Sequence, residues 1–137
     1  MTIGYSLAAR KAHLDTGVTA QVGGAGILTI YSGTQPATGG TATTALVSFT
    51  LGSPFAAAST GTLGGTVSIA PTLPSASTAT GTGIATWFRV TTSGGAQVID
   101  GTVGITGSGA DLQLPTTSIT TGLSVQITAW TINANNP

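Results

Sequence analysis

Apolar and polar residues alternate with a period of two through most of this chain, as expected for strands that bury one face. The clearest case is 46–51, which places Val47, Phe49 and Leu51 on the same face. Gly and Pro residues interrupt the alternation at short intervals and mark turns. The strands that this pattern predicts are 27–31, 46–51, 66–70, 84–91, 97–103, 112–114 and 123–132.

About eight short strands separated by turn signals predict an all-β fold. We expect an antiparallel β-sandwich, with a jelly roll as the version that this strand count favours. A short N-terminal helix precedes the strands.

That helix is expected over 6–16, where the spacing of apolar residues becomes helical. Ser6 is a suitable N-cap, and Gly17 is expected to end the helix in a left-handed conformation. A helix this short is marginal alone and must pack on something. The apolar residues that fall near one of its faces are Leu7, Leu14 and Val18.

Charge is distributed unevenly between the helix and the strands. Arg10, Lys11 and the single histidine, His13, all lie in the helix, whereas the rest of the chain is almost free of charge. We therefore divide the chain into an N-terminal helical docking segment, 1–22, and a β-sandwich domain, 23–137. The three basic side chains are candidate interface residues.

One hairpin can be aligned from its turn. Gly94 and Gly95 suit a two-residue type I′ turn, and this places Arg89 opposite Asp100. The two residues are expected to form an exposed cross-strand ion pair of little energetic value. The same register pairs Thr92 with Gln97, Thr91 with Val98 and Val90 with Ile99.

Two tryptophans fall on the polar side of their strands by alternation, Trp87 beside Arg89 and Trp130 in the last strand. One interpretation is a half-buried indole that is covered by a loop or by the helix. The other is an anchor at a protein interface or a platform on which a sugar stacks. Both tryptophans are therefore candidate interface residues.

The composition is typical of a subunit that is bound in an assembly. The 137 residues include three Lys or Arg and three Asp or Glu, and the net charge is zero. Soluble domains usually carry about a quarter charged residues, and charge is what keeps proteins apart. A neutral chain has no electrostatic reason to bind nucleic acid or an acidic membrane, so neither is expected as a partner. No secretory signal or membrane-spanning segment is apparent.

Catalytic chemistry is not expected. The three aspartates are scattered, Cys is absent and there is one His, so neither paired carboxylates nor a metal site is indicated. The glycine-rich stretch 104–109 lacks the lysine of a phosphate-binding loop. We expect no enzyme activity and no cofactor. The aspartates are Asp15, Asp100 and Asp111.

Several stretches together resemble the small head decoration, or cement, proteins of tailed bacteriophages and prophages. They are SLAAR in the helix, LTIYSGTQPA at 28–37, ATWFRV leading to VIDGTVG, GADLQL, and the closing SITTGLSVQITAW. The likeness covers most of the chain and is one of layout and composition.

The resemblance implies a β-sandwich that binds the outer surface of an assembled phage capsid. Proteins of this kind bridge subunits of the major capsid protein, commonly as dimers or trimers, and have no catalytic residues. It also implies assembly in the host cytoplasm and a final location on the virion. The alternatives are a jelly-roll carbohydrate-binding module that uses Trp87 or Trp130, and a phage tail or fibre component.

Overall fold

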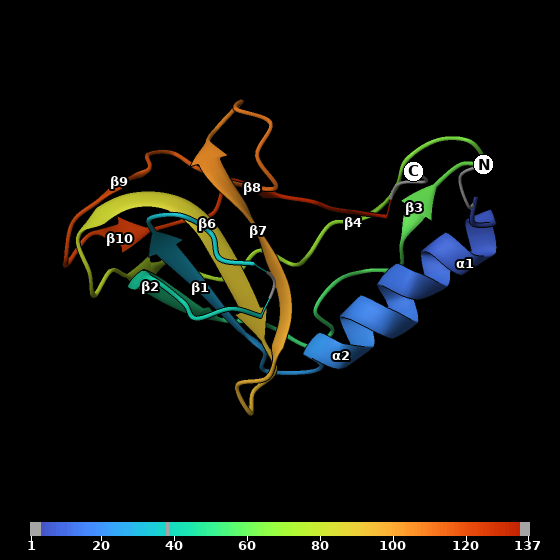
Figure 1. The fold of residues 1–137 in the computed structure, drawn as a ribbon, viewed down its shortest axis with the longest axis horizontal. Coiled ribbons are helices and arrows are strands. Elements are labelled where there is room, and N and C mark those ends of the chain that lie inside the picture. Colours follow the sequence, from blue (N-terminus) through green and yellow to red (C-terminus); the bar gives the residue numbers. More distant parts are fainter. Residues whose placement is uncertain (1–3, 38, 135–137) are drawn as a thin grey trace.

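A computed structural model describes residues 4–37 and 39–134. An N-terminal helix precedes a region built of strands (Figure 1), which confirms an all-β fold with a short helix. The helix consists of α1 (Leu7–Ala12), a π-helical stretch η1 (His13–Thr19) and α2 (Ala20–Val22). The strands are β1 (Ile27–Ser32), β2 (Thr44–Thr50), β3 (Thr60–Gly61), β4 (Val67–Ile69), β5 (Ser77–Thr78), β6 (Gly83–Thr91), β7 (Gln97–Ile105), β8 (Leu112–Leu114), β9 (Ser118–Ile119), β10 (Ser124–Val125), β11 (Ala129–Trp130) and β12 (Ile132–Ala134).

The largest sheet has the order β11-β8-β7-β6-β1-β2, with β9 paired to one end of β6. Two small sheets, β12-β4-β3 and β10-β5, complete the strand region. Among the described pairs, β7 and β8 run parallel while the others are antiparallel, so the expectation of a purely antiparallel fold is wrong here. The carboxylate of Asp111 accepts hydrogen bonds from the backbone N–H and the hydroxyl of Thr102, which holds the returning chain beside β7.

The core lies where the predicted alternation places it. Leu28 and Ile30 of β1 are fully buried, and they pair with Phe49 and Val47 of β2. In β4, which lies within the predicted strand 66–70, Val67 and Ile69 point inward. These side chains belong to one continuous apolar cluster that supplies most of the stability through burial.

The last predicted strand, 123–132, is broken into three. β10 pairs with β5, β11 with β8, and β12 with β4, so this segment passes from one sheet to another. Val125 and Ile127 are buried at a spacing of two, but the alternation slips by one residue before Trp130. A strand that changes partners cannot keep a single phase, because each new sheet sets its own register.

The helix starts as predicted and ends later. The Ser6 hydroxyl accepts a hydrogen bond from the N–H of Ala9, which confirms the N-cap. The expected end at Gly17 is wrong, because the helix continues to Val22 and Gly23 follows with a φ of 65°. Glycine inside a helix costs about 1 kcal/mol, and burial of Val22 four residues after Val18 outweighs that cost.

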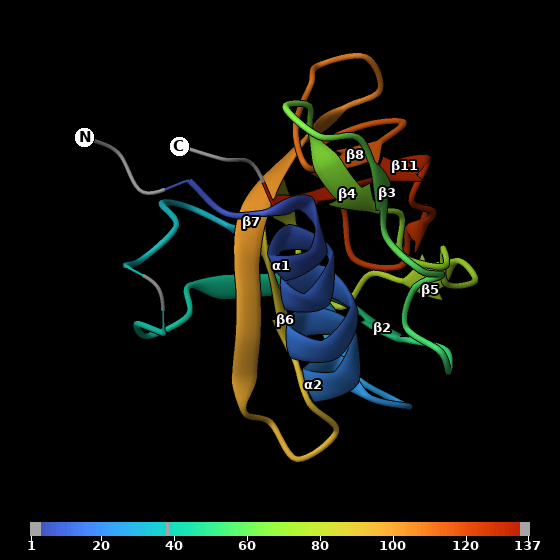
Figure 2. The same cartoon turned by 90° about the vertical axis from the view of Figure 1, so that its right-hand side faces the viewer.

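The helix packs onto the strand region rather than standing apart. Leu14 and Val22 are 1% and 2% exposed and belong to the same apolar cluster as the strands. Leu7 and Val18 pack against it. The strands that the helix contacts most are β4 and β12, and Figure 2 shows the helix in front of the strand region, running alongside β7. The core therefore runs across the boundary between 22 and 23. Residues 1–3, 38 and 135–137 of the two segments lie outside the described residues.

The β6–β7 hairpin has the predicted register at Arg89–Asp100 and Val90–Ile99. Its turn is different: Thr92 N–H donates to the carbonyl of Ala96, so 93–95 form a three-residue loop with Gly95 at a φ of 91°. The register shifts by one residue between Val90 and Thr91, so that Thr91 pairs with Gln97. This shift compensates for the third residue of the loop, and Arg89 therefore still pairs with Asp100. The predicted pairs Thr92–Gln97 and Thr91–Val98 are therefore wrong.

Candidate functional site

Arg10 fastens the start of the helix to the strands. Its side chain is buried, and the residue is 4% exposed. Nε donates to the carbonyl of Ala134 at 2.9 Å, and Nη2 donates to the carbonyl of Gly65 at 2.6 Å. The helix is thereby held to the end of β12 and to the turn between β3 and β4. Nothing in the local sequence of 65 or 134 signals this contact, because it joins residues distant in the chain.

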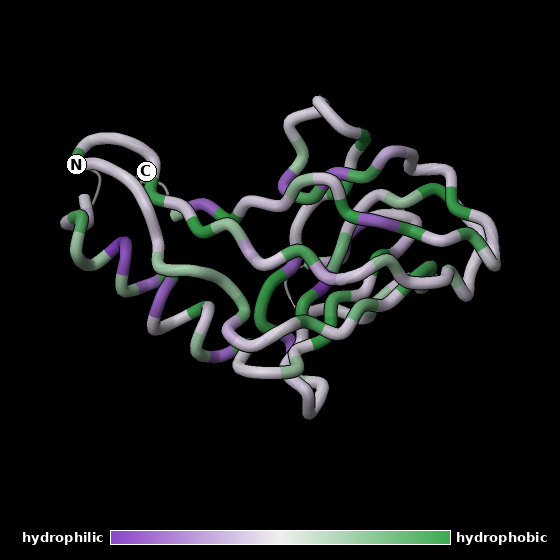
Figure 3. Tube along the Cα trace, turned by 180° about the vertical axis from the view of Figure 1, so that it is seen from behind, coloured by the Kyte–Doolittle hydropathy of each residue, from purple (hydrophilic) through white to green (hydrophobic). Residues whose placement is uncertain are grey.

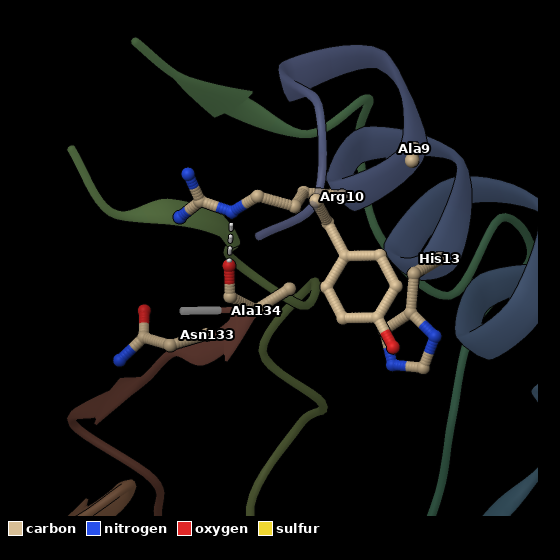
Figure 4. Close-up of a pocket in the computed structure, with 6 residues that line it drawn as sticks. Ala9, Arg10, His13, Asn133 and Ala134 are labelled. Atoms are coloured by element: carbon tan, nitrogen blue, oxygen red, sulfur yellow. Dashed lines mark hydrogen bonds between the residues drawn. The ribbon is translucent and has the colours of Figure 1, made fainter. Parts of the chain in front are cut away.

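A cavity of about 560 Å³ opens beside this contact. In Figure 4 the guanidinium of Arg10 lies on one side, above Asn133, and the imidazole of His13 projects from the next turn of the helix. The structure thus brings together two of the basic residues predicted as interface candidates. Its lining, among the described residues, is Tyr5, Ala9, Arg10, His13, Asn133 and Ala134.

Lys11, the third basic candidate, lies outside this cavity and is half-buried. Asp15 also turns away from the cavity: its carboxylate accepts hydrogen bonds from the N–H and the hydroxyl of Ser59, at 2.7 and 2.8 Å. These bonds fix the middle of the helix to the segment before β3. The charged group on the cavity wall is therefore the Arg10 guanidinium.

Trp87 is inside the protein, with an exposed fraction of 1%. Its ring stacks on Tyr31 with centroids 4.4 Å apart, and its Nε1–H donates to the Thr43 hydroxyl at 2.9 Å. The loop between β1 and β2 covers this face of the sheet, as in the first of the two interpretations, but the indole is fully buried rather than half-buried. In this structure Trp87 has no exposed face on which a sugar could stack.

Trp130 is also buried, at 3% exposed, and the expectation that it lies on the polar side is wrong. Its ring meets Phe55 and Phe88 edge to face, with centroids 5.4 and 5.6 Å apart. Such aromatic pairs stabilise a core beyond the area that they bury. The slip in alternation before this residue turns the indole inward.

The Arg89–Asp100 pair forms as predicted, but the expectation that it is exposed is wrong. Nε donates to Oδ1 at 2.7 Å and Nη2 to Oδ2 at 2.8 Å, while the side chains are 10% and 1% exposed. The Gly40 carbonyl accepts a third bond, and Arg89 Cζ lies 5.3 Å from the centroid of the Trp87 ring. The hydrogen bond with Asp100 raises the pKa of Arg89 above its usual value. This cluster is structural, since the loop from β1 to β2 closes over it.

These contacts leave the protein with few free charges. Each of the three carboxylates accepts hydrogen bonds within the chain, and both arginines donate to internal acceptors. Lys11 is the charged residue that makes no ion pair or hydrogen bond within the described ranges. In Figure 3 strongly hydrophilic residues recur along the helix, whereas most of the strand region is pale or green.

Other kinds of site are not indicated. In 4–37 and 39–134, no three residues among His, Cys, Asp and Glu gather as metal ligands would. Nor does any helix in these ranges have the length and apolar character needed to cross a membrane. No protein-family model, curated protein or solved structure matches this chain.

Proposed function

We propose that this chain is a structural virion protein, a capsid decoration protein that binds the outside of a phage head and bridges neighbouring capsomers. The observation that supports this best is the near absence of free charge. The 137 residues carry six charges that sum to zero, and two of these, Arg89 and Asp100, neutralise each other in an ion pair, so the surface is largely neutral. Such a surface lacks the repulsion that keeps soluble proteins apart.

Exposed apolar side chains lie near the helix start, where a partner can cover them. Tyr5 is 57% exposed and lines the Arg10 cavity, and Leu63 is 82% exposed in the turn whose Gly65 carbonyl binds Arg10. We propose this end, defined by α1, the β3–β4 turn and the end of β12, as the surface that meets the major capsid protein. We call it the helix end.

Affinity at each contact need not be high. A homodimer or homotrimer of the chain would meet several capsid subunits at once, and multivalent binding multiplies modest affinities. Clamping adjacent capsomers together would resist their separation by heat or by the pressure of packaged DNA. The finer fold expectation, a jelly-roll β-sandwich, also remains part of this proposal.

The rival functions differ in what supports them. A carbohydrate-binding module requires an exposed aromatic platform, and the two candidate indoles, Trp87 and Trp130, are buried. A tail or fibre component would share the neutral surface, so only the place of binding separates it from a head protein.

The test is to titrate the purified protein onto undecorated, expanded heads of the phage that encodes it, at low and high salt, and then to melt the heads. We expect saturable binding, a higher melting temperature of the heads, and little effect of salt. Salt has little to screen because the protein carries few charges and their sum is zero. Leu63→Ser should weaken binding, whereas Ile105→Ser, at a residue 52% exposed at the end of β7, serves as the matched control.

Failure to bind heads, or binding to tails instead, would overturn the proposal. Binding without a gain in head stability would exclude a cement role. Equal weakening by the two serine variants would show that the helix end is not the contact surface.

A further inference from the structure

Two arginines of this chain are buried, and they differ in one respect. Arg89 is paired with the carboxylate of Asp100, whereas Arg10 forms no ion pair among the described residues. A buried cation that lacks a counter-ion is costly, because carbonyl dipoles replace only part of its lost hydration. Within the part of the chain that the structure describes, the charge of Arg10 is therefore matched by no carboxylate.

The guanidinium of Arg10 also has more N–H donors than its two hydrogen bonds use. Of its five N–H groups, two donate to the carbonyls of Ala134 and Gly65. These two bonds fix the plane of the guanidinium, so the remaining donors are already oriented and little entropy is lost when they bind. The group borders a cavity of about 560 Å³, which is large enough for a side chain.

The other polar groups of the cavity also suit an anion. Asn133 supplies an amide and His13 supplies an imidazole, and both of these residues are exposed and line the same cavity as Arg10 (Figure 4). No carboxylate belongs to the lining that the structure describes. This chemistry suits a planar carboxylate, which a guanidinium can bind through two parallel hydrogen bonds.

We propose that this cavity binds the carboxylate of an Asp or Glu side chain on a different protein. A second copy of the chain is a poor donor of an acidic side chain, because it has three Asp and no Glu, and each Asp carboxylate accepts hydrogen bonds within its own chain. The inference rests on the proposed function to the extent that it identifies this partner as the capsid subunit. Because Arg10 is buried, an ion pair with it is screened less by salt than a pair between exposed side chains, in keeping with the small effect of salt expected above.

The experiment uses the full chain labelled with ¹⁵N and follows the two arginine Nε–Hε signals by NMR. The probes are N-acetyl-glutamate amide, its neutral match N-acetyl-glutamine amide, and inorganic phosphate. We expect glutamate to cause a saturable shift of the Arg10 signal while Arg89, already occupied by Asp100, does not move. The glutamine probe should have no effect, and phosphate should bind more weakly.

Variants separate binding from folding. His13→Ala and Asn133→Ala change exposed side chains and should each weaken glutamate binding roughly threefold to tenfold. Lys11→Gln removes the same charge as a change at Arg10 but lies outside the cavity, so it should leave affinity unchanged. Arg10→Lys keeps the charge and loses the planar fork, and circular dichroism reports whether the helix remains in place.

The outcomes also distinguish this inference from the proposed function. Glutamate binding by a protein that ignores phage heads would support the cavity and reject the capsid partner. Head binding unaffected by His13→Ala, together with no shift of the Arg10 signal, would overturn the cavity and leave the proposed function standing. Tighter binding of phosphate than of glutamate, or a shift that never saturates, would also overturn it.

Discussion

Removing one partner of the Arg89–Asp100 pair should destabilise the protein far more than the loss of a surface ion pair would. Exposed pairs contribute about 0–1 kcal/mol, whereas breaking a buried pair costs about 3–5 kcal/mol. Asp100 makes two short bonds to Arg89 and its side chain is 1% exposed, so the larger range applies. Asp100→Ala leaves the guanidinium with the Gly40 carbonyl and the Trp87 ring as its remaining partners.

We expect Asp100→Ala to lower the free energy of unfolding by about 3–5 kcal/mol, equivalent to a drop of roughly 10–20 °C in Tm for a chain of this size. Asp100→Asn should cost less, because the amide oxygen still accepts one hydrogen bond. Arg89→Met should also be severe, since it leaves a buried carboxylate without its cation. Urea unfolding followed by far-UV circular dichroism and by tryptophan fluorescence measures each value.

A double-mutant cycle with Arg89→Met and Asp100→Ala isolates the interaction itself. We expect a coupling energy of about 2 kcal/mol or more, because each single variant leaves one buried charge without its partner and the double variant leaves none. Ser48→Ala is the control: it removes a hydrogen bond to Thr29 on the exposed side of the neighbouring strands and should cost within about 0.5 kcal/mol. A coupling energy below about 1 kcal/mol would show that the pair behaves as a surface pair and would refute the reasoning.

The stabilisation by the Arg89–Asp100 pair should also be unchanged at mildly alkaline pH. The hydrogen bond with Asp100 raises the pKa of Arg89 above its usual value, and a raised pKa in the folded state means that the stabilisation is complete below the unfolded-state pKa. The stabilisation is lost only as the pH rises through the pKa of Arg89 in the folded state. The coupling energy should therefore be the same at neutral and mildly alkaline pH.

Three further predictions concern the core. Thr43→Val removes the acceptor of the Trp87 indole N–H, so it should cost about 1–3 kcal/mol in urea unfolding and change the tryptophan emission; unchanged stability would contradict the hydrogen bond. Gly101→Ala places a Cβ 2.6 Å from the Phe88 ring, and overpacking of this kind should cost about 1–3 kcal/mol, whereas a neutral result would mean that the ring moves aside. Leu14→Ala, at a residue 1% exposed, should cost about 2–5 kcal/mol, and a value near zero would show that the helix does not share the core.

The sequence determined the elements whose signals are local. The Ser6 cap depends on a hydroxyl three residues from the N–H that it accepts from, and the alternation of 46–51 reflects burial of one face of β2. The pairing of Arg89 with Asp100 is also predicted from the nearby turn, and it holds because the irregularity between Val90 and Thr91 offsets the third loop residue. Each of these features depends on neighbours along the chain, so a single sequence contains the information.

The tertiary structure decided which faces and charges are covered. Alternation shows that the two faces of a strand differ, but it cannot show that a loop folds over the polar one, and this is why Trp87 and Asp100 are buried. It cannot show that packing carries a helix through Gly17 either. The cavity beside Arg10 is formed by residues more than 120 positions apart, Arg10 and Ala134. Contacts of that range depend on the whole chain being folded, so no local pattern contains them.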